Sequence, residues 1–195
     1  MIQIQSRNSF IGLIISFLLT FIGAAYPSIS LADSWLPPTP ITSVSNSGKY
    51  RLTIFPASVF ESGPDRLPCE AALETLEGQR YVTLWRKPIA NEISPSTVFL
   101  ADDGRWVTLD NWARIGKGSN VIVFYDANGE MIKNYVLDQL LTKEEINPLT
   151  RTPSTVFWRE RQRLTHDGEL EITLTSGNKL RFNMADGTLL TSQNN

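Results

Sequence analysis

Two nine-residue stretches, FYDANGEMI at 124–132 and FNMADGTLL at 182–190, repeat each other at a spacing of 58 residues. Each places an Asn-Gly or Asp-Gly pair between two extended, largely apolar runs. Between such runs these pairs are the strongest short signal for a β-hairpin, because they tolerate positive φ. An EF-hand calcium loop is the alternative, but with Gly129 at its sixth position Phe124 and Tyr135 stand where the first and last ligands belong. The sequence therefore predicts a turn, and the repeat defines the fold class.

The pentapeptide PSTVF also occurs twice, at 95–99 and 153–157, again 58 residues apart. Inside each copy lies one more turn signal, at Gly104 and Gly168. These glycines are 64 residues apart, so the second copy gains six residues before this turn. A weaker copy, with turn signals of the same kind, precedes both. Internal repeats of this length indicate stacked copies of one supersecondary unit, and we expect units at about 40–90, 94–150 and 152–191.

Each unit alternates between extended runs and turns. VIVFYD at 121–126 is β-branched and aromatic, as in a buried strand, and GELEITLTSG at 168–177 alternates as in a strand with one solvated face. The chain is therefore predicted to be all-β, with two to three four-stranded antiparallel meander repeats in a domain at 48–191. An open fan, a sandwich or a barrel would accommodate them. A short helix is expected near 137–146, since Thr142 and Glu145 have the spacing of a capping box.

The succession of PSTVF, an Asp-Gly turn and VIVFYDxxG resembles the blade repeats of β-propellers in secreted bacterial proteins. The resemblance covers most of residues 94–191 and extends more weakly to 40–191. It implies four-stranded blades set side by side. Closed propellers have four or more blades, so three units imply an open fan, a collapsed barrel or sandwich, or half of a six-bladed dimer. Blade motifs are structural, and no functional residue carries over from them.

The N-terminus is predicted to be a secretory signal peptide at 1–32, followed by an extended, Pro-rich arm at 33–47. FIGLIISFLLTFIGA at 10–24 is an uncharged apolar run, and Ser30 and Ala32 occupy the −3 and −1 positions of a cleavage site. An uncleaved anchor is the alternative. The expected location is the periplasm or the extracellular space, with no membrane span after signal cleavage.

Composition restricts the partners that we expect. The chain has 18 Lys and Arg and 20 Asp and Glu, and removal of the segment that contains Arg7 leaves a net charge of −3. This mild acidity argues against nucleic acid as a partner, and leaves another protein or self-association. Cys69 is the only cysteine. It cannot form an internal disulfide, and we expect it to be a small buried apolar residue.

No motif for catalysis, metal binding or cofactor binding is complete, so no cofactor and no metal site are expected. IGKGSN at 115–120 lacks the glycine and the Ser or Thr that a P-loop requires. His166, the only histidine, lies at a predicted turn tip, and with Cys69 it supplies too few soft ligands for zinc. A hydrolase with a carboxylate-based site in the long loops is the alternative function. Its candidate acids are Asp102, Asp103, Asp110, Glu130 and Glu169.

The leading hypothesis is a non-enzymatic binding or assembly module of unknown ligand. Trp112 and Trp158 fall within the repeats, and Trp and Arg are favoured at binding hot spots. FWRERQRL at 157–164 has Arg159, Arg161 and Arg163 at alternate positions, which would place them on one face of a strand. These five residues are the candidate binding residues. The alternative is that the tryptophans fill the core and the arginines form a solvated face.

Overall fold

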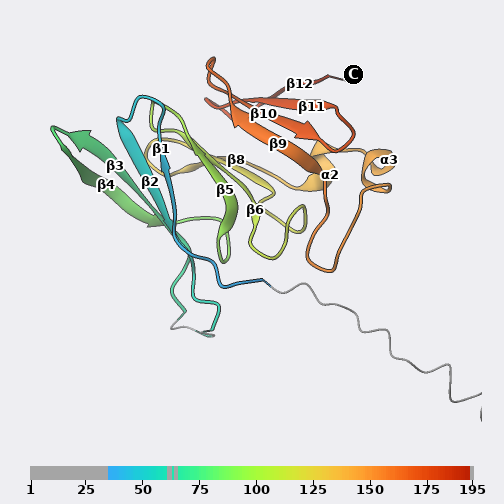
Figure 1. Cartoon of the computed structure of the whole chain (residues 1–195), viewed down its shortest axis with the longest axis horizontal. Coiled ribbons are helices and arrows are strands. Elements are labelled where there is room, and N and C mark those ends of the chain that lie inside the picture. Colours follow the sequence, from blue (N-terminus) through green and yellow to red (C-terminus); the bar gives the residue numbers. More distant parts are fainter. Residues whose placement is uncertain (1–34, 61–62, 64–65, 194–195) are drawn as a thin grey trace, which may run out of the picture. The chain divides into compact units, whose positions relative to one another are not determined.

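The computed structural model describes residues 35–60, 63 and 66–193. These residues form twelve β-strands in three antiparallel sheets, together with two short helices (Figure 1). The prediction of an all-β chain of four-stranded meander repeats is confirmed, and the repeats are three in number. Within these residues no sheet closes into a barrel. The expected signal peptide at 1–32 lies outside the described residues.

Each sheet contains four strands that follow one another in chain order. The first sheet is formed by β1 (Ile41–Val44), β2 (Tyr50–Phe55), β3 (Glu70–Glu77) and β4 (Arg80–Pro88). The second is formed by β5 (Pro95–Leu100), β6 (Trp106–Asn111), β7 (Ile122–Tyr125) and β8 (Met131–Tyr135). The third is formed by β9 (Arg159–Leu164), β10 (Glu169–Leu174), β11 (Lys179–Asn183) and β12 (Leu189–Gln193).

Glycines with positive φ close the hairpins that the repeat predicts. Gly129 turns β7 into β8 and Gly187 turns β11 into β12, with φ of 81° and 69°. The Asp126 carboxylate is engaged inside its own turn, because its Oδ1 accepts hydrogen bonds from the backbone N–H groups of Asn128 and Glu130 at 2.9 and 2.8 Å. An Asp satisfied by its own backbone is typical of a turn.

The two PSTVF pentapeptides occupy different places in the fold. Residues 95–99 lie in β5, whereas residues 153–157 precede β9 and make only isolated bridges to Ile115 and Arg151. The six extra residues of the second copy therefore move its strand downstream, so that β9 rather than the pentapeptide is the equivalent of β5. The hairpin glycines mark equivalent positions in the repeats, and the pentapeptide does not.

The middle sheet lies between the other two (Figure 1) and contributes residues to two hydrophobic cores, one with each neighbouring sheet. In the core facing the first sheet, Trp106 stacks on Tyr125 with ring centroids 3.8 Å apart. In the core facing the third sheet, the centroids of Phe124 and Phe182 are 5.6 Å apart. Successive residues of a strand point to opposite faces, so β6 and β7 feed both cores in turn and every one of their residues is buried.

The link between the second and third sheets contains α2 (Leu137–Leu140) and α3 (Lys143–Ile146), which confirms the helix expected near 137–146. Thr142 and Glu145 form the predicted capping box: the Thr142 N–H donates to the Glu145 carboxylate at 2.8 Å, and the Glu145 N–H donates to the Thr142 hydroxyl at 3.3 Å. Among the described residues, no helix has the length and apolar character needed to cross a bilayer.

Part of the expected N-terminal arm belongs to the first sheet. Residues 41–44 form β1 and pair with β2. Ahead of them, the Trp35 Nε1–H donates to the Ser154 hydroxyl at 3.0 Å, and the Trp35 ring meets Trp112 edge-on with centroids 6.2 Å apart. The described part of the arm is thus held against the loops of later repeats.

Candidate functional site: the outer face of the third sheet

Within the described part of the chain, the first and third sheets each have an outer face that no other sheet covers (Figure 1). On the first sheet this face carries paired charges: Arg51 donates to Glu74 at 2.8 Å, and Arg86 donates to Glu70 at 2.7 Å. Each arginine also lies over an aromatic ring, with its guanidinium carbon 4.3 or 4.1 Å from the ring centroid. Blades pack on one another through apolar faces, whereas a polar outer face is typical of a terminal repeat. The first sheet therefore resembles the end of a stack.

The outer face of the third sheet is mainly cationic. Arg163 on β9 and Lys179 and Arg181 on β11 all reach the carboxylate of Glu171 on β10, at 2.9, 3.2 and 3.1 Å. The Glu171 side chain is only 4% exposed beneath them. Pairing across the strands sets this arrangement, because Glu171 lies opposite Arg163 on one side and Arg181 on the other.

A fourth cation on this face, Arg161, has no acid partner in the described part of the chain. It lies opposite Thr173 in the register. The other acids of β9 and β10, Glu160 and Glu169, form no ion pair with these four cations among the described residues. Glu160, which lines the hollow on this face, and Glu169, which alternates with Glu171 on β10, nevertheless add negative charge, so that four cations face three acids. The face has an excess of positive charge.

Two opposing effects act on the pKa of Glu171. Burial alone would raise the pKa, because it disfavours the charged form. The hydrogen bonds from Lys179 and Arg163, together with their positive charges, lower it, and the net result is a pKa below the usual value for Glu. Glu171 therefore stays ionised under the cations. It acts as an anchor that holds their side chains in place.

The cationic face is hollowed. A shallow depression of about 730 Å³ lies over β9, β10 and the start of β11. Its lining residues are Glu160, Arg161, Gln162, Arg163, Glu171, Thr173, Gly177 and Lys179. Arg163 is 65% exposed at its side chain, so its guanidinium is open to a ligand. The lining is more polar than apolar, and Arg161, Arg163 and Lys179 supply hydrogen-bond donors for an anion.

The three arginines of β9 do not share one face, contrary to the prediction. The β9–β10 register shifts between Thr173 and Leu174, so that Arg161 lies opposite Thr173 and Arg159 lies opposite Leu174. Adjacent residues of β10 point to opposite faces, so this bulge sends Arg159 inward. A β-bulge inserts one residue and changes which face the following side chains occupy.

Arg159 and Trp158 instead bind a buried carboxylate, that of Asp110 at the end of β6. Asp110 Oδ2 accepts from Arg159 Nε at 2.9 Å, and Oδ1 accepts from Trp158 Nε1 at 3.1 Å and from the Gly116 N–H at 2.7 Å. Asp110 and Trp158 have no exposed surface. Arg159 and Trp158, two of the predicted binding residues, thus join the second and third sheets from within.

Trp112 is occupied by the chain's own N-terminal arm. Besides its contact with Trp35, its Nε1–H donates to the Leu36 carbonyl at 3.0 Å. Of the five predicted binding residues, the structure therefore leaves Arg161 and Arg163 on an open face. It brings Lys179 and Arg181 to them, which sequence reasoning missed. The signal available in the sequence was the alternation of Lys179 and Arg181 in KLRFN, the strand that follows the Gly177 turn and pairs with the strand of Glu171.

Most acids considered for a hydrolase have a hydrogen-bond or ion-pair partner within the fold. Asp102 accepts from the Ser47 N–H at 2.7 Å, a hydrogen bond that lowers the pKa of its carboxyl. Asp103 pairs with Arg105, Glu130 with Lys87, and Asp110 with Arg159. Within the described ranges, no group of three or more His, Cys, Asp or Glu side chains could hold a metal ion. No observation in the described residues favours a carboxylate-based reaction.

The described residues form a mostly β structure of three blade-like, four-stranded repeats, with a cationic outer face on the last one. Comparisons with protein-family models and with curated proteins each gave no match. Among solved structures, the crystal structure of HIRA(644-1017) is similar over 85% of this chain and 57% of that chain, with 11% identity and a TM-score of 0.32. The chain spans little more than half the length of that structure.

Proposed function

We propose that the protein is a secreted or periplasmic, non-enzymatic binding module that holds an acidic segment of a partner protein on the outer face of its third sheet. The observation that carries the proposal is the charge balance of this face. Arg161 has no acid partner in the described chain, and three further cations share the single carboxylate of Glu171. The predicted signal peptide supports the compartment.

The arrangement suits a carboxylate ligand. Arginine donates two parallel hydrogen bonds to a carboxylate, and such bonds are stronger than those between neutral groups. Arg161 and Arg163 lie two residues apart on one face of β9, so both can reach the same ligand segment. Glu171 keeps the neighbouring cations in position before any ligand arrives. The conformational entropy that these side chains lose on binding is therefore smaller.

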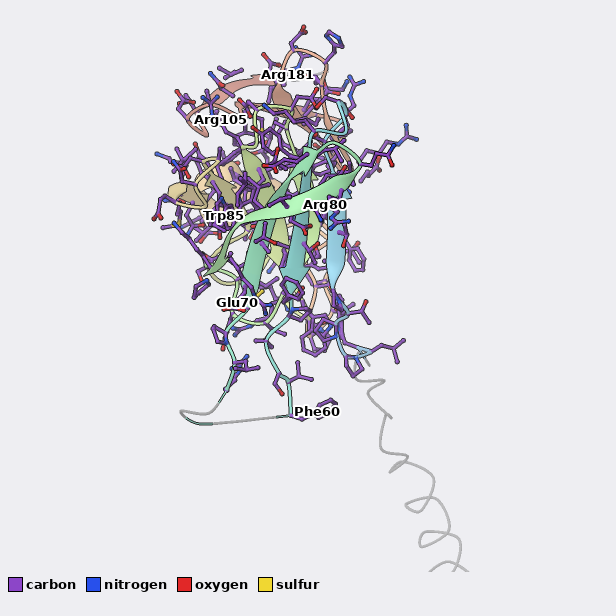
Figure 2. All side chains as sticks on the ribbon, turned by 90° about the vertical axis from the view of Figure 1, so that its left-hand side faces the viewer. Phe60, Glu70, Arg80, Trp85, Arg105 and Arg181 are labelled. Atoms are coloured by element: carbon purple, nitrogen blue, oxygen red, sulfur yellow. The ribbon has the colours of Figure 1, made fainter. Side chains whose placement is uncertain are left out.

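A peptide-binding measurement tests the proposal. The probe is a fluorescein-labelled ten-residue peptide with four Glu, followed by fluorescence anisotropy at low and at physiological salt. We expect Arg161→Glu to weaken binding about tenfold, which corresponds to ~1.4 kcal/mol. The matched control is Arg80→Glu, which makes the same charge change at an exposed position on the first sheet (Figure 2).

The control separates a local effect from a general one. Binding that responds only to Arg161→Glu supports the third sheet as the site. Equal weakening by Arg80→Glu would mean that the peptide senses only the net charge of the protein. A second control is the same peptide with its four Glu replaced by Gln. Equal affinity of the wild-type protein for the two peptides would refute the proposed function.

A further inference from the structure

A second hollow, mostly apolar, is lined by residues that are next in sequence to those of the cationic hollow. It has a volume of about 370 Å³ and lies between the α2–α3 link and the end of β10. Its apolar lining residues are Leu141, Pro148, Leu149, Phe157, Trp158 and Leu174. Phe157 is 47% exposed, whereas Leu141, Trp158 and Leu174 are buried. An exposed aromatic ring above a buried apolar floor is suited to receive one apolar side chain.

The apolar hollow and the cationic hollow are neighbours along two segments of the chain. On the β10–β11 hairpin, residues 174–176 line the apolar hollow, and Thr173, Gly177 and Lys179 line the cationic one. Phe157 and Trp158, just before β9, line the apolar hollow, and residues 160–163 of β9 line the cationic one. The β10–β11 hairpin and the chain that enters and forms β9 thus contribute to the linings of both hollows.

We propose that the two hollows form one composite site for an extended segment of a partner protein, in which an apolar residue enters the apolar hollow and acidic residues lie on the cationic face. This inference rests on the proposed function and adds the sequence class of the ligand. The hydrophobic anchor supplies affinity, and the charges supply orientation.

The spacing of the ligand residues follows from the spacing of the protein residues. Phe157 and Arg161 are four residues apart, which sets an upper limit of ~15 Å between their Cα atoms at ~3.8 Å per step. An extended ligand rises ~3.3 Å per residue. Its apolar residue and its first acidic residue are therefore at most about five positions apart.

A single acid in the apolar hollow restricts the ligand further. Glu145 lines this hollow, and it is held there by the capping box of α3. It repels an acidic residue placed beside the apolar anchor. The acids of the ligand must therefore lie on the side of Arg161 and Arg163, away from α3.

A second copy of the chain is a poorer occupant. The free sheet face that a second copy would offer is that of the first sheet, and its acids Glu70 and Glu74 already pair with Arg86 and Arg51. These pairs would have to break before the acids could meet the cationic face. A partner segment with unpaired acids has no such cost.

The experiment uses the purified protein and a set of labelled peptides. The reference peptide has one Phe, three spacer residues and three consecutive Glu. Its relatives replace Phe by Ala, replace Glu by Gln, or lengthen the spacer to ten residues. We expect Phe157→Ala to weaken binding of the reference peptide about tenfold. It should leave binding of the Phe-to-Ala peptide unchanged.

Phe60→Ala is the matched control. Phe60 is 85% exposed on the loop between β2 and β3, away from the strands (Figure 2), so the same truncation there should not affect binding. Thermal unfolding of each variant confirms that it is folded. Because Phe157 is half exposed, its truncation leaves the core intact.

The outcomes separate the inference from the proposed function. If Arg161→Glu weakens binding and Phe157→Ala has no effect, the composite site is refuted and the cationic face stands. If dextran sulfate binds as tightly as the reference peptide and equally to Phe157→Ala, the face serves a polyanion and the composite site is again refuted. If neither substitution affects binding, both proposals fail. If Arg161→Glu and Phe157→Ala each weaken binding of the reference peptide about tenfold, and the peptide with the longer spacer loses the effect of Phe157→Ala, both the proposed function and the composite site are supported.

Discussion

Replacement of Arg159 by Met is predicted to destabilise the protein strongly. Asp110 is fully buried, and Arg159, 12% exposed at its side chain, provides its only ion pair in the described chain, with Nη2 at 2.8 Å. Met preserves most of the apolar stem and removes the charge. Breaking a buried pair on one side costs ~3–5 kcal/mol, because the remaining charge stays uncompensated. The hydrogen bonds from Trp158 and Gly116 to Asp110 reduce the loss without removing it.

Urea unfolding followed by tryptophan fluorescence and circular dichroism measures this loss. In a thermal scan, a loss of ~3–5 kcal/mol at ~2–4 °C per kcal/mol for a chain of this size should lower the melting temperature by about 6–20 °C. The control is Arg161→Met, two residues away on the same strand. Because the bulge places Arg161 on the open face, its replacement should change stability by less than about 0.5 kcal/mol.

Two results would refute the reasoning. A loss below about 1 kcal/mol for Arg159→Met would show that Asp110 does not depend on the ion pair. Equal losses for both variants would show that the two arginines share an environment, as simple strand alternation predicts, and that the bulge is wrongly placed.

Three more predictions concern glycine, cysteine and glutamate positions. Gly187→Ala should cost ~3 kcal/mol or more, because a Cβ there would lie 2.6 Å from the Lys133 Cβ, whereas Gly48→Ala should cost only ~1 kcal/mol of backbone strain, since nothing lies within 4 Å; similar melting temperatures would contradict this. Burial raises the pKa of Cys69 to about 12, so a disulfide reagent at pH 8 should react only after denaturation, and stability should fall as the pH rises from ~8.5 toward 12; rapid reaction of the native thiol would argue against burial. Because the folded-state pKa of Glu171 is lowered, the stability it contributes is present above the usual value of 4.5 and is lost as the pH falls through the folded-state pKa. Glu171→Gln should therefore make the unfolding free energy depend less on pH in this acid range, and an unchanged dependence would count against the ion-pair cluster.

The repeat could be read from the sequence because its markers have a local cause. A hairpin turn with positive φ needs Gly, and the requirement holds wherever the strand pair lies. Gly129 and Gly187 therefore mark equivalent turns. The PSTVF pair had no such cause, and identical residues serve as a strand in one copy and as a connection in the other. A sequence match indicated equivalent structure where the backbone conformation required that residue, as at the turn glycines, and not where the residues were merely identical, as in PSTVF.

The candidate site was only partly predictable for the same reason. Arg161 and Arg163 follow from strand alternation, but the bulge that turns Arg159 inward depends on pairing with β10 and has no local signal. Lys179 and Arg181 join the site only when the hairpin register is known. Trp158 is an aromatic residue next to a run of arginines, yet its hydrogen bond to the distant Asp110 decides its role. Residues distant in the chain determine these outcomes.

The middle sheet has a consequence for how the protein can diverge. Every residue of β6 and β7 is buried, so neither strand has a position where a substitution is free of packing constraint. The first and third sheets each keep one open face, where side chains can be exchanged without disturbing a core. Selection for a new ligand would therefore act on the two end sheets, while the sequence of the middle sheet changes slowly.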